Sequence, residues 1–123
     1  MEKRVTGIGG FFFKATDPAA LMDWYGKHLG LDTTPYGCTF HWKDSDGRDA
    51  STQWSVFKND TKYLEPSAKE FMQNFRVENL DRLVAQLRSE GVTFVGEPEA
   101  HDYGKFAWIM DPEGNKIELW EAV

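Results

Sequence analysis

The sequence predicts a single α+β domain in which a strand, a helix and three further strands occur twice in the same order. Apolar residues change from an alternating spacing to a three- and four-residue spacing and back, twice along the chain. A glycine follows each helical stretch, at Gly30 and at Gly91. Each half also contains a hairpin-type turn, which includes Gly47 or Gly114. This repetition indicates an internal repeat rather than two unrelated segments.

Length and charge limit the classes of function. The chain has 123 residues, of which 41% are hydrophobic and 28% charged, and this suits one folded core. Its net charge of -6 would repel a phosphate backbone, so we expect no binding to nucleic acid. No apolar stretch approaches the ~20 residues of a membrane span, and the first residues do not resemble a secretion signal. We therefore expect a cytoplasmic protein that does not associate with membranes.

The first half begins with a strand over residues 5–16, which are rich in phenylalanine and β-branched side chains. Asp17 is the expected N-cap of a helix, with Pro18 at its first position and Gly30 at its end. Residues 31–42 contain two short strand-like pieces, broken near Pro35 and Gly37. Residues 44–47 predict a hairpin turn, and residues 51–57 form the returning strand.

The second half follows a polar connector, residues 58–70, which has no sustained periodicity. Residues 71–77 resume strand character, and Asn79 is the expected cap of a helix that ends at Gly91. Its apolar stripe consists of Leu80, Leu83, Val84 and Leu87. We expect strands over residues 92–95 and 105–110, a turn at 111–114 and a last strand over 117–121.

These elements form two βαβββ modules, residues 5–57 and 71–121, within one domain that covers residues 1–123. A single module of this size would leave one face of its sheet uncovered. Two modules side by side are therefore expected to curl into an incomplete barrel around a central, partly polar cleft. The cleft is the expected place of function.

Three segments carry a resemblance to a known family: DPAALMDWYGKHLGL, FRVENLDRLVAQLRSEGV and YGKFAWIMDPEGNKIELWE. Together they resemble the vicinal oxygen chelate superfamily, which comprises glyoxalases, bleomycin-resistance proteins and extradiol dioxygenases. The resemblance spans nearly the whole chain and implies the glyoxalase-like fold. It also implies either sequestration of a small molecule or metal-assisted chemistry on a small carbonyl compound through enolate-like or oxyanion intermediates.

Metal enzymes of that superfamily hold a divalent ion with one side chain from the first and one from the last strand of each module. Here the corresponding positions are Gly10, Gln53, Met72 and Glu118, of which only Glu118 is a hard anionic ligand. We therefore expect no cofactor and disfavour a divalent metal. A relocated site made of His41, His101 and Glu118 is the less favoured alternative.

Strand alternation predicts which side chains face the cleft. Because Ile117 and Leu119 are expected to pack under the helices, Glu118 and Trp120 point inward. By the same rule Phe75 and Val77 pack outward. Aromatic residues are too numerous for the space under two helices, and several are expected to line a wall that suits a planar or cationic molecule. The expected ligand-binding residues are Phe12, Trp42, Trp54, Met72, Asn74, Phe106, Trp108 and Trp120.

Two functions stay open at this point. The first is a metal-independent protein of the glyoxalase and bleomycin-resistance type that binds a small organic molecule. The second is a lyase or isomerase acting on a small carbonyl compound, with Glu118 as general base and Tyr103 or His101 as proton donor. A purely structural role of Glu118, as the ion-pair partner of a nearby lysine or arginine, is as well supported by the sequence as a functional one. Cys38 is expected to pack rather than to react.

We also expect a homodimer. Two small sheets leave apolar and aromatic strand edges exposed, and a second copy of the chain would cover them and could complete the cleft.

Overall fold

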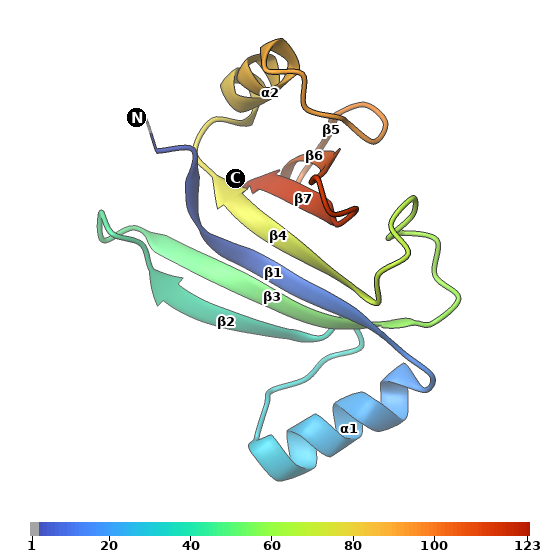
Figure 1. Ribbon diagram of the computed structural model, residues 1–123. Coiled ribbons are helices and arrows are strands. Elements are labelled where there is room, and N and C mark those ends of the chain that lie inside the picture. Colours follow the sequence, from blue (N-terminus) through green and yellow to red (C-terminus); the bar gives the residue numbers. More distant parts are fainter. Residues whose placement is uncertain (1–2) are drawn as a thin grey trace.

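A computed structural model describes residues 3–123 of the chain as two helices and one mixed sheet of seven strands (Figure 1). In chain order the elements are β1 (Val5–Ala15), α1 (Pro18–Leu29), β2 (Cys38–Lys43), β3 (Asp49–Lys58), β4 (Phe71–Val77), α2 (Leu80–Ser89), β5 (Glu99–His101), β6 (Gly104–Met110) and β7 (Lys116–Glu121). The α+β class predicted from the sequence is confirmed.

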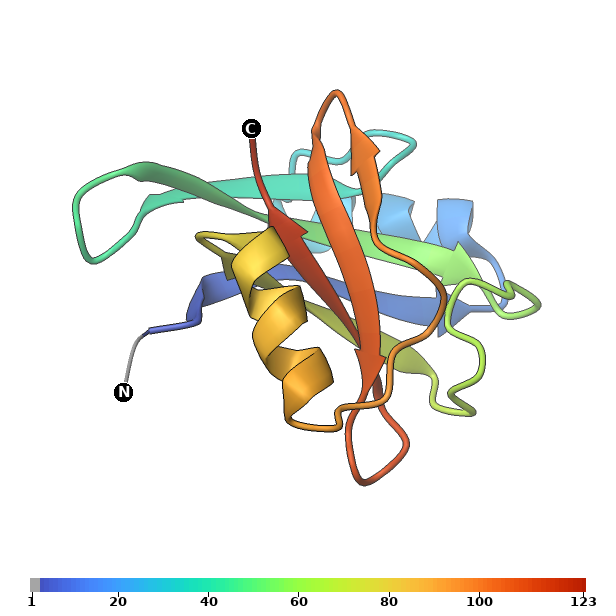
Figure 2. The ribbon, with the colours of Figure 1, turned by 90° about the horizontal axis from the view of Figure 1, so that it is seen from above.

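The strands lie in the order β2-β3-β1-β4-β7-β6-β5. In each half the first strand pairs in parallel with the last strand, β1 with β3 and β4 with β7. The two halves join where β1 and β4 pair antiparallel at the centre of the sheet. The sheet curls, so that β6 crosses the direction of β3 when seen from above (Figure 2). This symmetry places equivalent positions of the two halves in one row across the centre.

Local sequence signals fix the helix ends as predicted. The Asp17 carboxylate accepts a hydrogen bond from the backbone N–H of Ala20, and Asn79 does the same for Arg82. Gly30 ends α1 with φ of 71°, in the left-handed region that glycine tolerates best. The helices lie at opposite ends of the molecule (Figure 1).

Both helices lie over the same face of the sheet, which we call the outer face. Under α2 the outer face carries Val77, Ala107 and Leu119, packed against Leu80, Leu83 and Val84 of the helix. The opposite, inner face carries Phe12, Met72 and Trp108. The predicted assignment of Phe75, Val77, Ile117 and Leu119 to the helix side of the sheet is therefore confirmed.

Two expected strands differ from the structure. Residues 92–95 contribute only an isolated bridge, Phe94 to Ile109, because Gly96 with φ of 68° and Pro98 interrupt the pairing. The strand resumes as the short β5, which the sequence did not predict. Of the two strand-like pieces expected within residues 31–42, the second is β2, whereas the first contributes only an isolated bridge from Thr34 to Gly37.

Lys58, the first residue of the expected connector, belongs to β3, whereas residues 59–70 contain no helix or strand and cover the inner face. Leu64 of the connector is 0% exposed and packs with Phe12, Met72 and Trp108. The connector therefore occupies much of the space that the sequence predicted as an open cleft between the modules. Figures 1 and 2 both show it beside the segment that leads into β5.

Helix α1 is packed less tightly than α2. None of its residues is buried, although Tyr25 contacts the ring of Trp54 on β3, with centroids 4.7 Å apart. Neither helix in the described residues is long and apolar enough to cross a membrane.

The packing predicts that Leu119→Ala lowers the free energy of unfolding by about 2–5 kcal/mol, because Leu119 is 3% exposed in the core under α2. Leu29→Ala is the matched control: Leu29 is 59% exposed on α1, and its replacement should change stability by less than about 0.5 kcal/mol. Chemical denaturation measures both. Equal losses would contradict the assigned faces.

Candidate ligand-binding site

A buried carboxylate, that of Glu118 on β7, lies at the centre of the inner face. Its residue is 4% exposed. Oε1 accepts a hydrogen bond from Asn74 Nδ2 at 2.7 Å, and Oε2 accepts one from Trp108 Nε1 at 2.8 Å. The Tyr63 hydroxyl of the connector also donates to Oε2. Three of about four acceptor positions on the carboxylate are therefore taken by neutral donors.

Strand register brings two of these donors together. Glu118 pairs directly with Asn74 on β4 and with Trp108 on β6, so the three side chains stand in one row on the inner face. The third donor, Tyr63, comes from a segment 55 residues away in sequence. Burial of a charged group requires such partners, since an isolated carboxylate in an apolar environment is strongly destabilising.

Asn74 is 2% exposed and holds one end of the row. Its Oδ1 is the buried side-chain polar atom that has no hydrogen-bond partner among the described residues. Oδ1 lies against Gly9, where an added Cβ would be only 2.1 Å away. Any larger residue at position 9 would displace Asn74 and with it a donor to Glu118.

A lysine lies two residues before Glu118 and contacts the connector. Lys116 Nζ donates to the backbone carbonyl oxygen of Tyr63 at 2.6 Å and lies 5.2 Å from the centroid of the Tyr63 ring. Burial lowers the pKa of the Lys116 ammonium, and the nearby Glu118 opposes this effect. Burial, reinforced by the charge and hydrogen bond of Glu118, raises the pKa of the Tyr63 phenol well above its usual range.

A cavity of about 290 Å³ opens beside this cluster, between the connector and strands β5 to β7. Aromatic rings and two carboxylates form its walls. Near β5, His101 Nε2 lies 2.9 Å from Glu99 Oε1, and the His101 ring stacks on Tyr103 with centroids 5.1 Å apart. The lining residues are Tyr63, Glu99, His101, Tyr103, Phe106, Trp108 and Glu118.

Four other hollows in the described part of the chain have a larger volume, and two of them, of about 710 and 600 Å³, flank α1. Both are shallow depressions beside a helix that buries none of its residues. Neither is lined by a buried carboxylate or by the aromatic row of the inner face. Chemical convergence therefore favours the smaller cavity as the candidate site.

The structure brings together five residues that the sequence indicated for catalysis or ligand binding. Those that line the cavity are His101, Tyr103, Phe106, Trp108 and Glu118. Trp120 lies next to them, because its ring stacks on that of Phe106. The guanidinium of Arg76 lies 4.9 Å from the centroid of the Trp120 ring.

Three further expected residues support the site from below. Phe12 and Met72 pack against Leu64 of the connector, and Asn74 is bonded to Glu118. The expectation that all three border the cavity with Trp108 and Glu118 is therefore wrong. The connector, which the sequence left as a linker, fills the intervening space.

Trp42 and Trp54 lie elsewhere, and their expected place in the cleft is corrected. Trp54 faces the outer side of the sheet, where it contacts Phe13 of β1 and Tyr25 of α1. Trp42 lies on β2, at the edge opposite β5, and its Nε1 donates to Thr52 Oγ1. Alternation along β3 makes an inward Trp54 incompatible with an inward Gln53.

Sequence reasoning missed Tyr63 and Glu99. Tyr63 lies in the connector, which has no periodicity, and Glu99 lies in the unpredicted β5. The one available signal for Tyr63 was an aromatic and a leucine, adjacent to each other within an otherwise polar segment.

The residues present do not fit the metal site that the superfamily implies. The row across the sheet is Gln53, Gly10, Asn74 and Glu118, so the β4 position is Asn74 and not Met72. Gly10 offers no ligand, and Asn74 directs its amide N–H at Glu118. Among residues 3–123 no group of three or more histidine, cysteine, aspartate or glutamate side chains converges.

The structure does not support the relocated metal site either. His41 lies on β2 and His101 on β5, and among residues 3–123 these two histidines form no converging group with Glu118.

Comparison with known proteins agrees with this fold. The family model of the glyoxalase-like domain matches residues 10–120 of the sequence. The chain belongs to the glyoxalase-like family, within the vicinal oxygen chelate superfamily. A search of curated protein sequences found no significant match.

Solved structures with the same fold include two methylmalonyl-CoA epimerases. The protein from Mycobacterium tuberculosis is 23% identical, with a TM-score of 0.67 over 100% of this chain and 92% of the other. A variant of the Streptomyces coelicolor epimerase is 18% identical, with a TM-score of 0.72 over 97% of this chain and 99% of the other. An NAD-dependent benzaldehyde dehydrogenase from Legionella pneumophila is 16% identical, with a TM-score of 0.60 over 93% and 98%. Similarity at this level establishes the glyoxalase-like fold.

The environment of Tyr63 predicts a pH effect. Its folded-state pKa is raised, so its contribution to stability is fully present below the unfolded value of about 10 and is lost as pH rises above it. Unfolding free energy should therefore fall more steeply between about pH 10 and 11 for the wild type than for Tyr63→Phe. Folded wild type and Tyr63→Phe should also show the same tyrosinate absorbance at about pH 11. An additional tyrosinate in the folded wild type would contradict the assignment.

Proposed function

We propose that the protein binds a small planar organic molecule in the cavity beside Glu118, and that neutral or cationic molecules bind better than anionic ones. The observation that carries this proposal is the convergence of a buried carboxylate with a row of aromatic rings. Phe106 lies between Trp108 and Trp120 with nearly parallel ring planes, at 14° and 6°. Aromatic faces with few, well-placed polar groups are typical of sites for small organic ligands.

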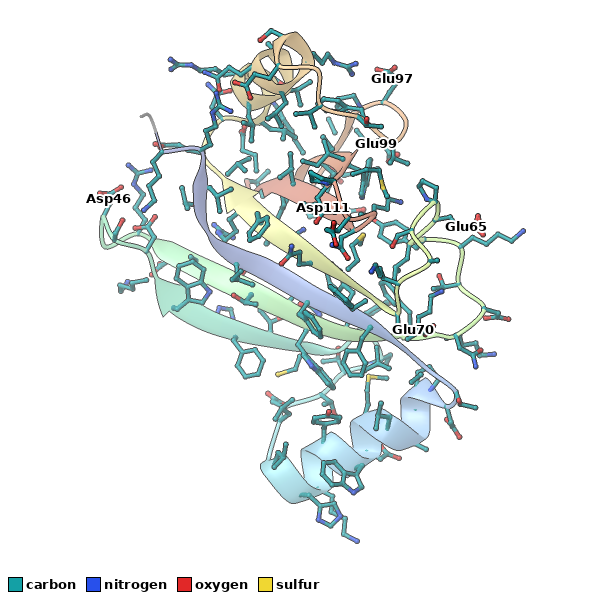
Figure 3. All side chains as sticks on the ribbon, in the orientation of Figure 1. Asp46, Glu65, Glu70, Glu97, Glu99 and Asp111 are labelled. Atoms are coloured by element: carbon teal, nitrogen blue, oxygen red, sulfur yellow. The ribbon has the colours of Figure 1, made fainter. Side chains whose placement is uncertain are left out.

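Charge supports the choice of ligand. Glu99 and Glu118 both line the cavity. Glu65 of the connector and Glu97 lie on the same side of the molecule as Glu99 (Figure 3). An anion would meet this negative field, which attracts cations and tolerates neutral molecules.

The same charges argue against a coenzyme A ester as ligand, although two structural neighbours are methylmalonyl-CoA epimerases. Coenzyme A carries several phosphate charges and needs basic side chains to hold them. The cavity has a volume of about 290 Å³ and Glu99 at its edge, a setting that suits a much smaller and less acidic molecule.

An isomerase or lyase with Glu118 as general base is the alternative. A general base needs an acceptor position directed at the substrate. The bonds from Asn74, Tyr63 and Trp108 leave about one such position on Glu118, and a substrate proton would have to reach that one position. Binding needs no free acceptor position, and we favour it.

A panel of planar compounds tests the proposal: a neutral aromatic alcohol, benzamidinium as a cation, benzoate as an anion, and coenzyme A. Tryptophan fluorescence and the thermal unfolding midpoint should respond to the first or second and not to benzoate or coenzyme A. No response to any compound would contradict the proposal, and a preference for benzoate would contradict the charge argument.

Trp108→Ala should weaken binding of the active compound by about 1–3 kcal/mol, through lost stacking and apolar contact. Trp24→Ala is the matched control, because Trp24 is exposed on α1 and contacts Tyr25 and His28 instead. Affinity of that variant should equal the wild-type affinity. Circular dichroism checks that both variants fold, and equal affinities in all three proteins would place the ligand elsewhere.

The homodimer expected from the sequence stays a prediction. Phe11, Phe40 and Phe71 are exposed, and Phe11 stacks on Phe71 with centroids 6.0 Å apart, so an apolar surface is available for a second copy. Light scattering at micromolar concentration should give twice the chain mass of 14.1 kDa. The mass of a single chain would reject the prediction.

A further inference from the structure

Tyr63 occupies part of the candidate site although its residue is 42% exposed. Its hydroxyl donates to the buried Glu118, while much of the residue remains accessible to solvent. The backbone beside it is held independently, by burial of Leu64 and by the bond from Lys116 Nζ to the Tyr63 carbonyl oxygen. The side chain can therefore rotate away from Glu118 without release of the connector.

The surroundings of the Tyr63 ring are complementary to a phenol. The ring meets Phe57 and Trp108 edge to face, at interplanar angles of 82° and 89°. An anionic acceptor, Glu118 Oε2, receives the hydroxyl group. The ammonium of Lys116 lies 5.2 Å from the ring centroid, where a cation attracts an electron-rich ring.

We propose that Tyr63 is an internal, displaceable occupant of a site for a neutral phenol-type ligand. A ligand would exchange its own aromatic hydroxyl group for that of Tyr63 on Glu118. This inference rests on the proposed binding function and narrows its ligand class.

Hydrogen bonding explains why the ligand must carry a donor. Loss of the Tyr63 hydroxyl leaves Glu118 Oε2 with only the bond from Trp108, in a place where the residue is 4% exposed. An incoming ring without a donor would leave that acceptor short of a partner, and this is costly for a buried charge. An aromatic hydroxyl group restores the bond.

Charge explains why a neutral ligand is favoured at this position. A cationic ring in the place of Tyr63 would lie beside Lys116 Nζ, which is also 5.9 Å from the Trp108 ring. Repulsion from Lys116 offsets attraction to Glu118 there. A neutral phenol gains from both groups.

Removal of the internal occupant provides the test. p-Cresol, the side chain of tyrosine as a free molecule, is titrated into full-length wild type, Tyr63→Phe and Tyr63→Ala, with toluene and benzamidinium as comparison probes. Affinity for p-cresol should increase in that order, by about tenfold or more from wild type to Tyr63→Ala, because one hydrogen bond to a charged group no longer competes. Toluene and benzamidinium should bind Tyr63→Ala more weakly than p-cresol does, because toluene has no hydroxyl group for Glu118 and benzamidinium is repelled by Lys116. Tyr36→Ala, at an exposed tyrosine, should bind p-cresol as the wild type does.

The outcomes separate this inference from the proposed function. Equal p-cresol affinity in wild type and both Tyr63 variants would overturn the inference while other planar ligands still bind. Equal affinity of Tyr63→Ala for toluene and p-cresol would also overturn it, because the carboxylate would then play no part. If Tyr63→Ala does not fold, Tyr63→Phe decides alone, since it keeps the ring and removes only the donor. No binding of any probe to any variant would reject the proposed function itself.

Discussion

The buried carboxylate of Glu118 is the constraint on which the inner face depends. A charged group that is almost fully buried must be surrounded by hydrogen-bond donors, and here they come from β4, β6 and the connector. This one requirement accounts for the inward direction of Trp108, for the burial of Asn74 and for the way Tyr63 reaches across the cavity. It also links the connector to the second module, because release of Tyr63 would leave an acceptor short of a partner.

The same row of residues shows how a glyoxalase-like fold can carry a site without the usual ligand set. The central positions of β3, β1, β4 and β7 are Gln53, Gly10, Asn74 and Glu118, which offer two amides, no side chain and one acid. Instead of converging on an ion, Asn74 and Glu118 bond to each other. Aromatic rings from β6 and β7 then supply the contact surface next to the carboxylate.

Signals that act over a few residues were sufficient to predict most of the fold. Asp17 and Pro18 start α1 and Gly30 ends it, because capping and backbone conformation depend on neighbouring residues. Alternation placed Glu118 inward and Leu119 outward for the same reason. Residues 92–95 were mispredicted because Gly96 and Pro98 divide the strand at a point that apolar content does not reveal.

The site was predictable only in part, since it depends on contacts between distant segments. Strand parity indicated Glu118 and the number of aromatic residues indicated Trp108, but no local pattern shows that Tyr63 meets a residue 55 positions away. Trp54 was assigned to the cleft because aromatic residues are numerous. In the structure it pairs with Phe11 on β1, and because the next residue, Phe12, faces inward, Phe11 and Trp54 lie on the outer face. Counting residues along β4 gave Met72 as the metal-ligand position, whereas the residue that pairs with Glu118 is Asn74. The pairing of β1 with β4 contains register shifts, so a count along one strand does not identify the residue opposite it.

A double-mutant cycle between Tyr63→Phe and Glu118→Gln tests the central claim most directly. The free energy of unfolding is measured for the wild type, both single variants and the double variant at neutral pH. If the hydroxyl and the carboxylate hold the connector on the inner face, the two substitutions should be non-additive by about 0.5–3 kcal/mol. Additive effects would show that Tyr63 and Glu118 are not coupled, and the account of the site would then be contradicted.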